Sequence, residues 1–277
     1  MNFLALLLLG LAAEKDDGGY ILTKPERSLE DIDKIYASMP PVKYSPPADR
    51  WQHIERTKKA LEEGGKLRIV MLGDSIVNDT SRSGWTLLLG RRYPRVTIET
   101  VTSVRGSTGC WWYKEDGRLK KYVLDQKPDL LIIGGISQRD DIDSIRTVIE
   151  KVRAGSKAEI LLMTGAFGDV DPRDDKKWSF AIDPAGKDYR ARLKRLAEEV
   201  KTAFIDMHDL WGKYVRNSGK DLGWFKRDPI HANEKGEQIL GRLLEQHFAP
   251  DETKSGPGAQ PKPEAESRPK PEARNEQ

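Results

Sequence analysis

The sequence predicts an α/β domain in which five parallel strands form a sheet covered by helices on both faces. Five short apolar runs, partly β-branched, follow one another between residues 67 and 207. Amphipathic segments of helical length separate these runs. The runs are almost continuously apolar, as expected for parallel strands that are buried on both faces. These observations together predict a single three-layer α/β sandwich.

Strands and helices alternate along the chain in a regular order. A first helix begins near Trp51 and ends at Gly64, with Ile54 and Leu61 on the same face as Trp51. The predicted strands lie at 67–72, 96–101, 129–135, 159–164 and 202–207. The predicted helices that follow lie near 84–93, 117–126, 142–154, 186–200 and 233–248.

The regions outside this core differ from it in composition. Residues 3–13 form an apolar run too short for a bilayer, which takes about 20 residues, and we expect a signal peptide at residues 1–13 rather than a buried N-terminal helix. Residues 14–50, rich in proline and charge, are expected to be an extended N-terminal segment before the domain at 51–249. Residues 250–277 are expected to be a disordered tail, because from Asp251 onward they contain no large aliphatic or aromatic side chain. A signal peptide predicts a secreted or periplasmic protein.

Charge and cysteine content exclude several kinds of partner. The 47 basic and 44 acidic residues nearly balance, and no basic block carries interleaved aromatics, so we expect no nucleic-acid partner. A single cysteine, Cys110, excludes an intrachain disulfide. The sequence contains no cluster with zinc-ligand spacing, and we expect no metal, no cofactor and no membrane span.

The segment RIVMLGDSIVNDT, residues 68–80, places Ser75 directly after the first predicted strand. In open parallel sheets, ligands bind outside the carboxyl ends of the strands. Ser75 therefore lies either in an ordinary strand-to-loop turn or at the reactive edge of the sheet.

A serine hydroxyl becomes an effective nucleophile when a base accepts its proton, and a carboxylate orients that base. Four histidines are present, and His231 follows Asp228 by three residues in KRDPIHANEKG, just before the last predicted helix. One tight turn can supply both groups at this spacing. Capping by Asp228 and a surface position for His231 are the structural alternatives.

The GDSI segment and the DPIHANEKG segment together resemble the SGNH hydrolases, also called GDSL esterases. The resemblance covers roughly residues 66–248 and implies a flavodoxin-like α/β sandwich. It implies that Ser75 is the nucleophile, His231 the general base and Asp228 the orienting acid. It leaves Asp74 to hold the loop by hydrogen bonds.

The resemblance also implies an oxyanion hole built from three loops. The family's glycine block matches GSTG at 106–109, and this match assigns a backbone N–H donor to Gly109, together with the N–H of Ser75. The family's asparagine is absent from KPDLLIIGGISQRDD. Alignment on Gly135 puts Ser137 at its position, whereas counting from the start of the strand puts Gln138 there. We expect Gln138 to be the donor, since its amide offers the same N–H.

Trp111 and Trp112 follow the glycine block directly, and Arg139 follows Gln138. Aromatic side chains on such a loop can stack on a sugar ring, so we expect these three residues to bind substrate. Closure of the hydrophobic core is the alternative role for the tryptophans.

We therefore expect a secreted serine esterase that removes O-acetyl groups from a carbohydrate, with an acetylated polysaccharide as the ester substrate. A non-catalytic carbohydrate-binding protein on the same scaffold is one alternative. A lipase or lysophospholipase is another, although the predicted loop at 165–185 is strongly charged. A flavodoxin-like electron carrier is less consistent, since no phosphate-binding loop follows the first strand.

Overall fold

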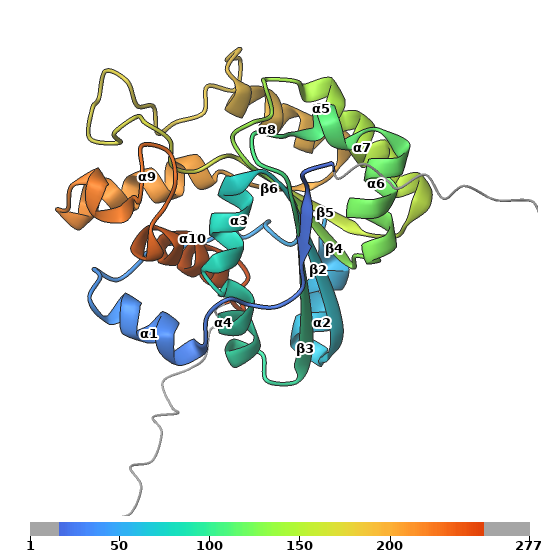
Figure 1. Cartoon of the computed structure of the whole chain (residues 1–277), viewed down its shortest axis with the longest axis horizontal. Coiled ribbons are helices and arrows are strands. Elements are labelled where there is room, and N and C mark those ends of the chain that lie inside the picture. Colours follow the sequence, from blue (N-terminus) through green and yellow to red (C-terminus); the bar gives the residue numbers. More distant parts are fainter. Residues whose placement is uncertain (1–16, 252–277) are drawn as a thin grey trace, which may run out of the picture.

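The structure, a computed structural model, describes residues 17–251. A six-stranded sheet lies at its centre with helices on both sides (Figure 1). The expected signal peptide at 1–13 and the expected tail from residue 252 onward lie outside the described residues. Within residues 17–251, no helix is long and apolar enough to cross a membrane.

The sheet has the strand order β1-β3-β2-β4-β5-β6. Five strands run parallel, and β1 pairs antiparallel with β3 at one edge. The five parallel strands, numbered along the chain, have the order 2-1-3-4-5, which is the flavodoxin-like arrangement. The strands are β1 (Tyr20–Leu22), β2 (Gly65–Gly73), β3 (Val96–Val104), β4 (Leu130–Ile133), β5 (Glu159–Met163) and β6 (Ala203–Ile205).

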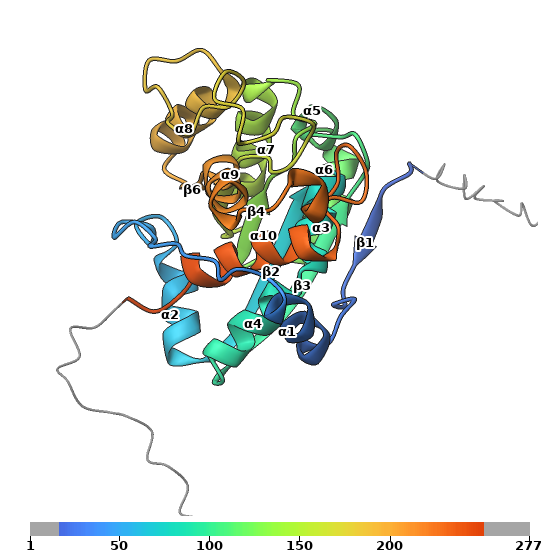
Figure 2. The same cartoon turned by 90° about the vertical axis from the view of Figure 1, so that its left-hand side faces the viewer.

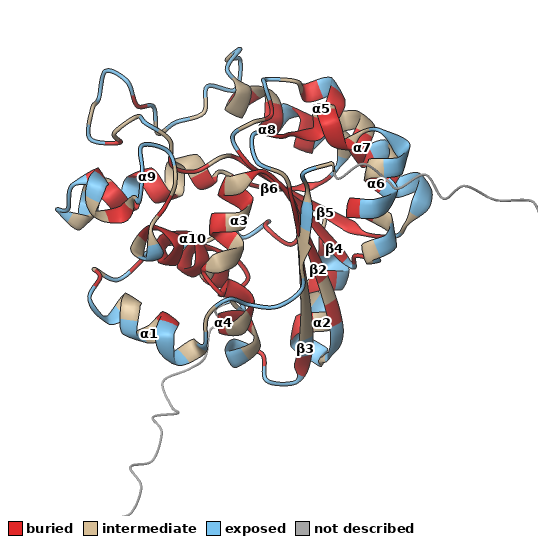
Figure 3. Ribbon diagram, viewed as in Figure 1, coloured by how far each residue is buried: buried red, intermediate tan, exposed pale blue. Residues whose placement is uncertain are grey.

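Alternate side chains of the central strands point into two separate hydrophobic clusters. Ile69 and Met71 of β2 belong to one cluster, and Val70 and Leu72 belong to the other. Helices α2, α3, α4, α9 and α10 contribute to the first cluster, and α5 to α8 to the second (Figures 1 and 2). The buried residues concentrate on the sheet and on the helix faces toward it (Figure 3).

The helices have the following bounds. They are α1 (Leu29–Ala37), α2 (Glu55–Glu63), α3 (Ser75–Arg82), α4 (Trp85–Arg92), α5 (Cys110–Tyr113), α6 (Asp116–Tyr122), α7 (Ile142–Gly155), α8 (Tyr189–Val200), α9 (Met207–Ser218) and α10 (Glu234–His247). Two short 3₁₀ helices lie at Leu124–Gln126 and Leu222–Phe225.

The predicted α/β sandwich is confirmed, and the strand count is corrected from five to six. The additional strand β1 and the helix α1 both fall within 14–50, so this segment is not extended throughout. The helices α3, α5 and α9 were also not predicted. Two of them, α3 and α5, begin directly at loops of the predicted site.

The chain places β3 on one side of β2 and then places β4 on its other side, so β2 and β4 are neighbours where the strand order reverses. This switch point opens a crevice at the carboxyl ends of the strands. The turn from β2 into α3 and the loop after β4 both lie there, as does the loop after β3 on the next strand. The fold therefore brings the three predicted site loops to one edge of the sheet.

Candidate active site

The turn between β2 and α3 places Ser75 at the first residue of a helix. Asp74 is fully buried and caps α3, with its Oδ1 accepting a hydrogen bond of 2.9 Å from the Ile76 N–H. Its Oδ2 accepts the N–H groups of Ile136 and Ser137 at 2.8 and 2.7 Å. Asp74 therefore joins the Ser75 turn to the loop after β4, in the loop-holding position expected for it.

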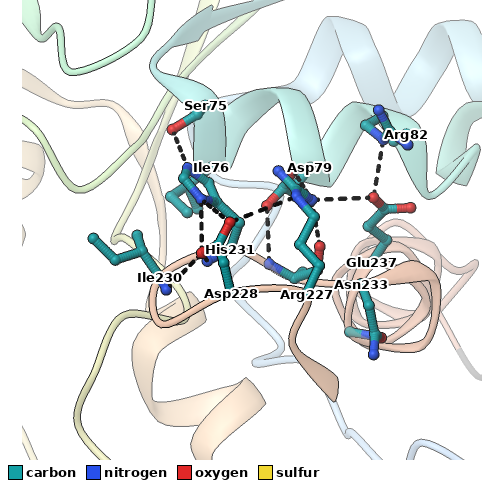
Figure 4. Close-up of polar contacts among 12 residues, drawn as sticks. Ser75, Ile76, Asp79, Arg82, Arg227, Asp228, Ile230, His231, Asn233 and Glu237 are labelled. Carbon is teal, nitrogen blue, oxygen red and sulfur yellow. Dashed lines mark hydrogen bonds and ion pairs between the residues drawn. The ribbon is translucent and has the colours of Figure 1, made fainter. Parts of the chain in front are cut away.

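The hydroxyl of Ser75 points to the imidazole of His231 (Figure 4). The Ser75 Oγ lies 2.8 Å from the His231 Nε2. The His231 Nδ1 lies 2.9 Å from Oδ2 and 3.0 Å from Oδ1 of Asp228. This is the geometry in which a carboxylate orients a base and the base receives the serine proton. The structure thus brings together all three residues predicted to form the triad, and their catalytic roles stay a prediction.

Asp228 and His231 lie in one tight turn before α10. The Asp228 Oδ1 accepts the N–H groups of Ile230 and His231, each at 2.8 Å. These backbone N–H groups, that of His231 first, hold the pKa of the Asp228 carboxyl well below its usual range. The carboxylate therefore stays ionised at neutral pH and keeps a fixed orientation toward the imidazole.

Asn233 and Gly236, which follow His231 in the same DPIHANEKG segment, hold the turn in place. The Asn233 Oδ1 caps α10 by accepting the N–H groups of Lys235 and Gly236 at 2.9 and 3.1 Å. Its Nδ2 donates to the carbonyl of Trp224 at 3.0 Å. A Cβ atom on Gly236 would collide with the Phe225 carbonyl, so the helix approaches too closely for a side chain there.

The loop after β5 supports the same turn from its other side. The Gly168 N–H donates to the Ile230 carbonyl at 3.1 Å. The Lys226 ammonium donates to the carbonyls of both Gly168 and Pro229. The Asp228–His231 turn is therefore held by backbone and side-chain hydrogen bonds on two sides.

Two of the predicted oxyanion donors, the N–H groups of Ser75 and Gly109, lie at the starts of helices. Ser75 is the first residue of α3, and Gly109 is the N-cap of α5. Within residues 17–251, neither N–H has a hydrogen-bond acceptor. Helix starts carry partial positive charge, so both groups suit a developing negative oxygen.

Gln138, the third predicted donor, is buried with an exposed fraction of 2%. Its Oε1 accepts the Cys110 N–H at 2.9 Å, and its Nε2 donates to the Gly134 carbonyl at 2.8 Å. The side chain thus braces the glycine loop against the end of β4. Donation to an oxyanion stays a prediction that depends on the second hydrogen of Nε2. Ser137, the alternative residue, is partly exposed.

The three residues predicted to bind substrate divide into two groups. The Trp111 Nε1 donates to the Ser137 carbonyl at 2.9 Å, and the guanidinium carbon of Arg139 lies 3.6 Å from the centre of a Trp111 ring. Trp111 is partly exposed and Arg139 is exposed, and both lie at the loop after β4. Trp112 is 8% exposed and packs against Tyr113 in the core. The prediction that Trp112 contacts substrate is therefore corrected, because its ring faces the protein interior.

Sequence reasoning missed a buried ionic group beneath the triad. Asp79 lies four residues after Ser75 on α3 and is fully buried. It contacts Arg227, which directly precedes Asp228. A spacing of four residues places two side chains on one face of a helix, but it could not be used because α3 itself was not predicted. Within residues 17–251, no group of three or more acidic, histidine or cysteine side chains could hold a metal ion.

Comparison with known proteins identifies related chains. A sequence model of the GDSL-like Lipase/Acylhydrolase family matches residues 71–239. The uncharacterized esterase YxiM of Bacillus subtilis is 26% identical over 196 residues, which is 64% of this chain and 50% of YxiM. The chain thus spans about half the length of that relative.

Solved structures share the fold. The acetylxylan esterase Axe2 from Geobacillus stearothermophilus has a TM-score of 0.53 and 19% identity, over 68% of this chain and 96% of Axe2. A mutant of Axe2, described as an acetyl-xylooligosaccharide esterase, also has a TM-score of 0.53 and 19% identity. That match covers 70% of this chain and 99% of the mutant chain.

Proposed function

Since this chain belongs to the GDSL-like lipase/acylhydrolase family, we propose that it is a secreted serine esterase that removes O-acetyl groups from a carbohydrate. The observation that carries the proposal is the continuous hydrogen-bonded path from Ser75 through His231 to Asp228. Neither a binding protein nor an electron carrier has a chemical need for these three groups in this order.

The proposed reaction is a two-step acyl transfer. The Ser75 Oγ attacks the ester carbonyl while the His231 Nε2 takes its proton, and Asp228 stabilises the resulting imidazolium. The N–H groups of Ser75 and Gly109 donate to the tetrahedral oxyanion. His231 then protonates the leaving alcohol, and an acyl-serine remains. Water, deprotonated by His231, attacks this ester and releases acetate, which restores the Ser75 hydroxyl.

The surroundings of the triad favour a short acyl group on a polar substrate. The side chain of His231 is 27% exposed and that of Asp228 is 42% exposed, so a bulky polymer can approach. Among residues 17–251 the exposed large hydrophobic side chains are Tyr20, Ile136 and Ile230, of which Ile230 lies in the triad turn and Ile136 beside Ser137. Two isoleucines offer contact to a methyl group but not the wide apolar surface that a lipid chain needs.

The carbohydrate part of the proposal is supported by Trp111 and Arg139. The indole is fixed by its bond to the Ser137 carbonyl, so stacking of a sugar on it costs little conformational entropy. The similar fold of Axe2, which is named an acetylxylan esterase, agrees with such a substrate. A lipase or lysophospholipase of the same family and a non-catalytic carbohydrate-binding protein are the alternatives to test.

Export is the remaining part of the proposal, and it is supported by the apolar run at 3–13 alone. Expression of the full chain in a bacterial host, followed by sequencing of the N-terminus, tests it directly. Cleavage near Ala12 or Ala13 supports export, and an intact Met1 contradicts it.

The activity is tested by acetate release from acetylated xylo-oligosaccharides and from 4-nitrophenyl acetate. We expect Ser75→Ala to lower kcat by at least about 10⁴-fold, whereas Ser81→Ala on the same helix retains activity. Ser81 is the matched control because its hydroxyl bonds to Thr102 rather than to His231. Faster hydrolysis of a long-chain ester than of acetate would favour the lipase. Sugar binding without any ester hydrolysis would favour the binding protein.

A further inference from the structure

Helix α3 carries a buried acidic side chain, Asp79, on the same face as Ser75. Asp79 follows Ser75 by four residues, which is close to one helical turn. It has an exposed fraction of 0%, and buried carboxylates are rare unless they are paired. The partners that compensate the burial of this carboxylate therefore indicate its role.

Both oxygens of Asp79 contact the turn that carries the base. The Oδ2 accepts the N–H of Ala232 at 3.0 Å, and the Oδ1 lies 2.8 Å from Nη1 of Arg227 (Figure 4). Arg227 directly precedes Asp228, and Ala232 directly follows His231. Asp79 thus holds the catalytic turn at both of its ends.

The turn is closed on itself between these two points. The Arg227 N–H donates to the His231 carbonyl at 3.1 Å, and residues 226 and 232 form an antiparallel bridge. A displacement of Arg227 or Ala232 therefore moves the imidazole as well. Because Ser75 and Asp79 belong to one rigid helix, the contacts of Asp79 fix the imidazole relative to the nucleophile.

A second carboxylate extends this arrangement to α10. Glu237 has a side chain that is 1% exposed, and its Oε1 lies 2.9 Å from Nε of Arg82 and 3.7 Å from Nη1 of Arg227. Its Oε2 pairs with Arg27 of the N-terminal segment. Helices α3 and α10 and the catalytic turn are thereby joined through alternating charges.

We infer that Asp79 is a positioning residue for acyl transfer, whose ionised carboxylate holds the Asp228–His231 turn in register with Ser75 through Arg227 and Ala232. This inference rests on the proposed function of the triad. A carboxylate is required rather than any polar group because both oxygens face donors. Oδ1 faces the Arg227 guanidinium, and Oδ2 faces the Ala232 N–H. Loss of the charge removes the ion pair between Asp79 and Arg227 and leaves the hydrogen bond from the Ala232 N–H.

The charge state of Asp79 gives the inference a measurable signature. Burial raises the pKa of Asp79 to about 6, and Arg227 opposes this rise while Glu237 adds to it. Other charged or titratable groups around it are Arg82, Tyr20, Asp228 and His231. Above about pH 6 the carboxylate is ionised and holds Arg227, and below that pH it is protonated and resembles an asparagine.

The test compares wild type with Asp79→Asn in 4-nitrophenyl acetate hydrolysis between about pH 5 and 8. At the alkaline end we expect kcat to fall by about 10- to 100-fold with little change in KM, as for a misplacement of reacting groups. The ratio of wild-type to variant kcat is expected to fall toward one as the pH drops through about 6. A merely structural carboxylate would not give a ratio that depends on pH in this way.

Glu159→Gln is the matched control. Glu159 is 8% exposed and accepts the Thr57 N–H at 2.7 Å, but it lies at the start of β5, away from the catalytic edge. We expect this variant to keep the wild-type kcat at every pH. If Asp79→Asn fails to fold, Arg227→Gln tests the same contact between Asp79 and Arg227, since the Arg227 side chain is 40% exposed.

Wild-type kcat in Asp79→Asn and in Arg227→Gln, or a ratio that is constant with pH, overturns the inference. Failure of the proposed function gives a different result, because then Ser75→Ala retains activity or the wild type hydrolyses no ester. Loss of activity in Ser75→Ala together with an unaffected Asp79→Asn rejects the positioning role alone.

Discussion

At the scale of single residues, the backbone around Gly109 has little room for change. A Cβ atom there would lie 2.7 Å from Oε1 of Gln138 and 2.8 Å from the Ser137 carbonyl. Replacement by alanine must therefore move the turn that carries the Gly109 N–H. We expect Gly109→Ala to lower kcat for 4-nitrophenyl acetate by about 10²- to 10³-fold, the usual effect of losing one oxyanion donor.

Gly117→Ala is the control for this substitution. Gly117 lies in α6, and a Cβ atom there meets nothing within 4 Å. Alanine is favoured over glycine inside a helix by about 0.5–1 kcal/mol, so this variant should keep its activity and gain slightly in thermal stability. A wild-type kcat in Gly109→Ala would remove Gly109 from the oxyanion hole.

The sequence predicted local relations between residues well and distant ones poorly. The contact between Asp228 and His231 followed from their spacing, since a single turn contains both. The bracing contacts of Gln138 depend on how closely loops from two strands approach, which no local pattern encodes. Trp112 was misplaced because consecutive helical residues point about 100° apart, so Trp111 can be partly exposed while its neighbour is buried.

At the scale of elements, the start of α3 depends on Asp74. Removal of this side chain uncaps the helix and leaves the N–H groups of Ile136 and Ser137 without their acceptor. Each lost contact costs about 1 kcal/mol or more, so Asp74→Ala should lower the free energy of unfolding by about 2–4 kcal/mol. We expect kcat to fall as well, because Ser75 loses its fixed position. Urea denaturation and acetate release measure the two effects.

Asp188→Ala separates capping from loop attachment. Asp188 caps α8 through one contact, to the Ala191 N–H at 3.1 Å, and is exposed. Its removal should cost about 1 kcal/mol with no change in kcat. Equal losses of stability in the two variants would contradict the role of Asp74 in joining the two loops.

Among the elements that the sequence did not predict, β1 and α5 are short and α3 begins at a turn of the site, whereas α9 is a full helix of 12 residues. Strand β1 has three residues, too few to show an alternating pattern. Helix α3 has only eight residues and begins at Ser75, directly at the turn of the predicted site. Helix α1 did leave a signal, the capping box between Ser28 and Asp31, within a segment whose prolines indicated extended chain.

At the scale of the whole molecule, the buried His247 and the partly buried His208 make stability depend on pH. Burial lowers the pKa of His247 to about 3 and that of His208 to about 4. Between these values and the ordinary value of 6.5, the unfolded chain binds protons that the folded chain does not. The free energy of unfolding should therefore fall as the pH is lowered from about 6.5 toward 4.

His247→Asn isolates one of these contributions. We expect the stability advantage of wild type over this variant to shrink by about 1.4 kcal/mol for each pH unit between about 6.5 and 4. Asp79, whose pKa is raised, acts in the opposite direction between its ordinary value and about 6 and is the same in both proteins. Urea denaturation at several pH values measures the difference, and a difference that is independent of pH would contradict a neutral buried His247.

The nucleophile can be identified most directly by covalent labelling with a fluorophosphonate, followed by mass spectrometry of the peptides. The Ser75 Oγ, activated by His231, should displace fluoride and carry a single label in the wild type. His231→Ala should slow this labelling by about 10³-fold or more, because no base then accepts the serine proton. A label on another residue, or an unchanged rate in His231→Ala, would contradict acyl transfer through Ser75, His231 and Asp228.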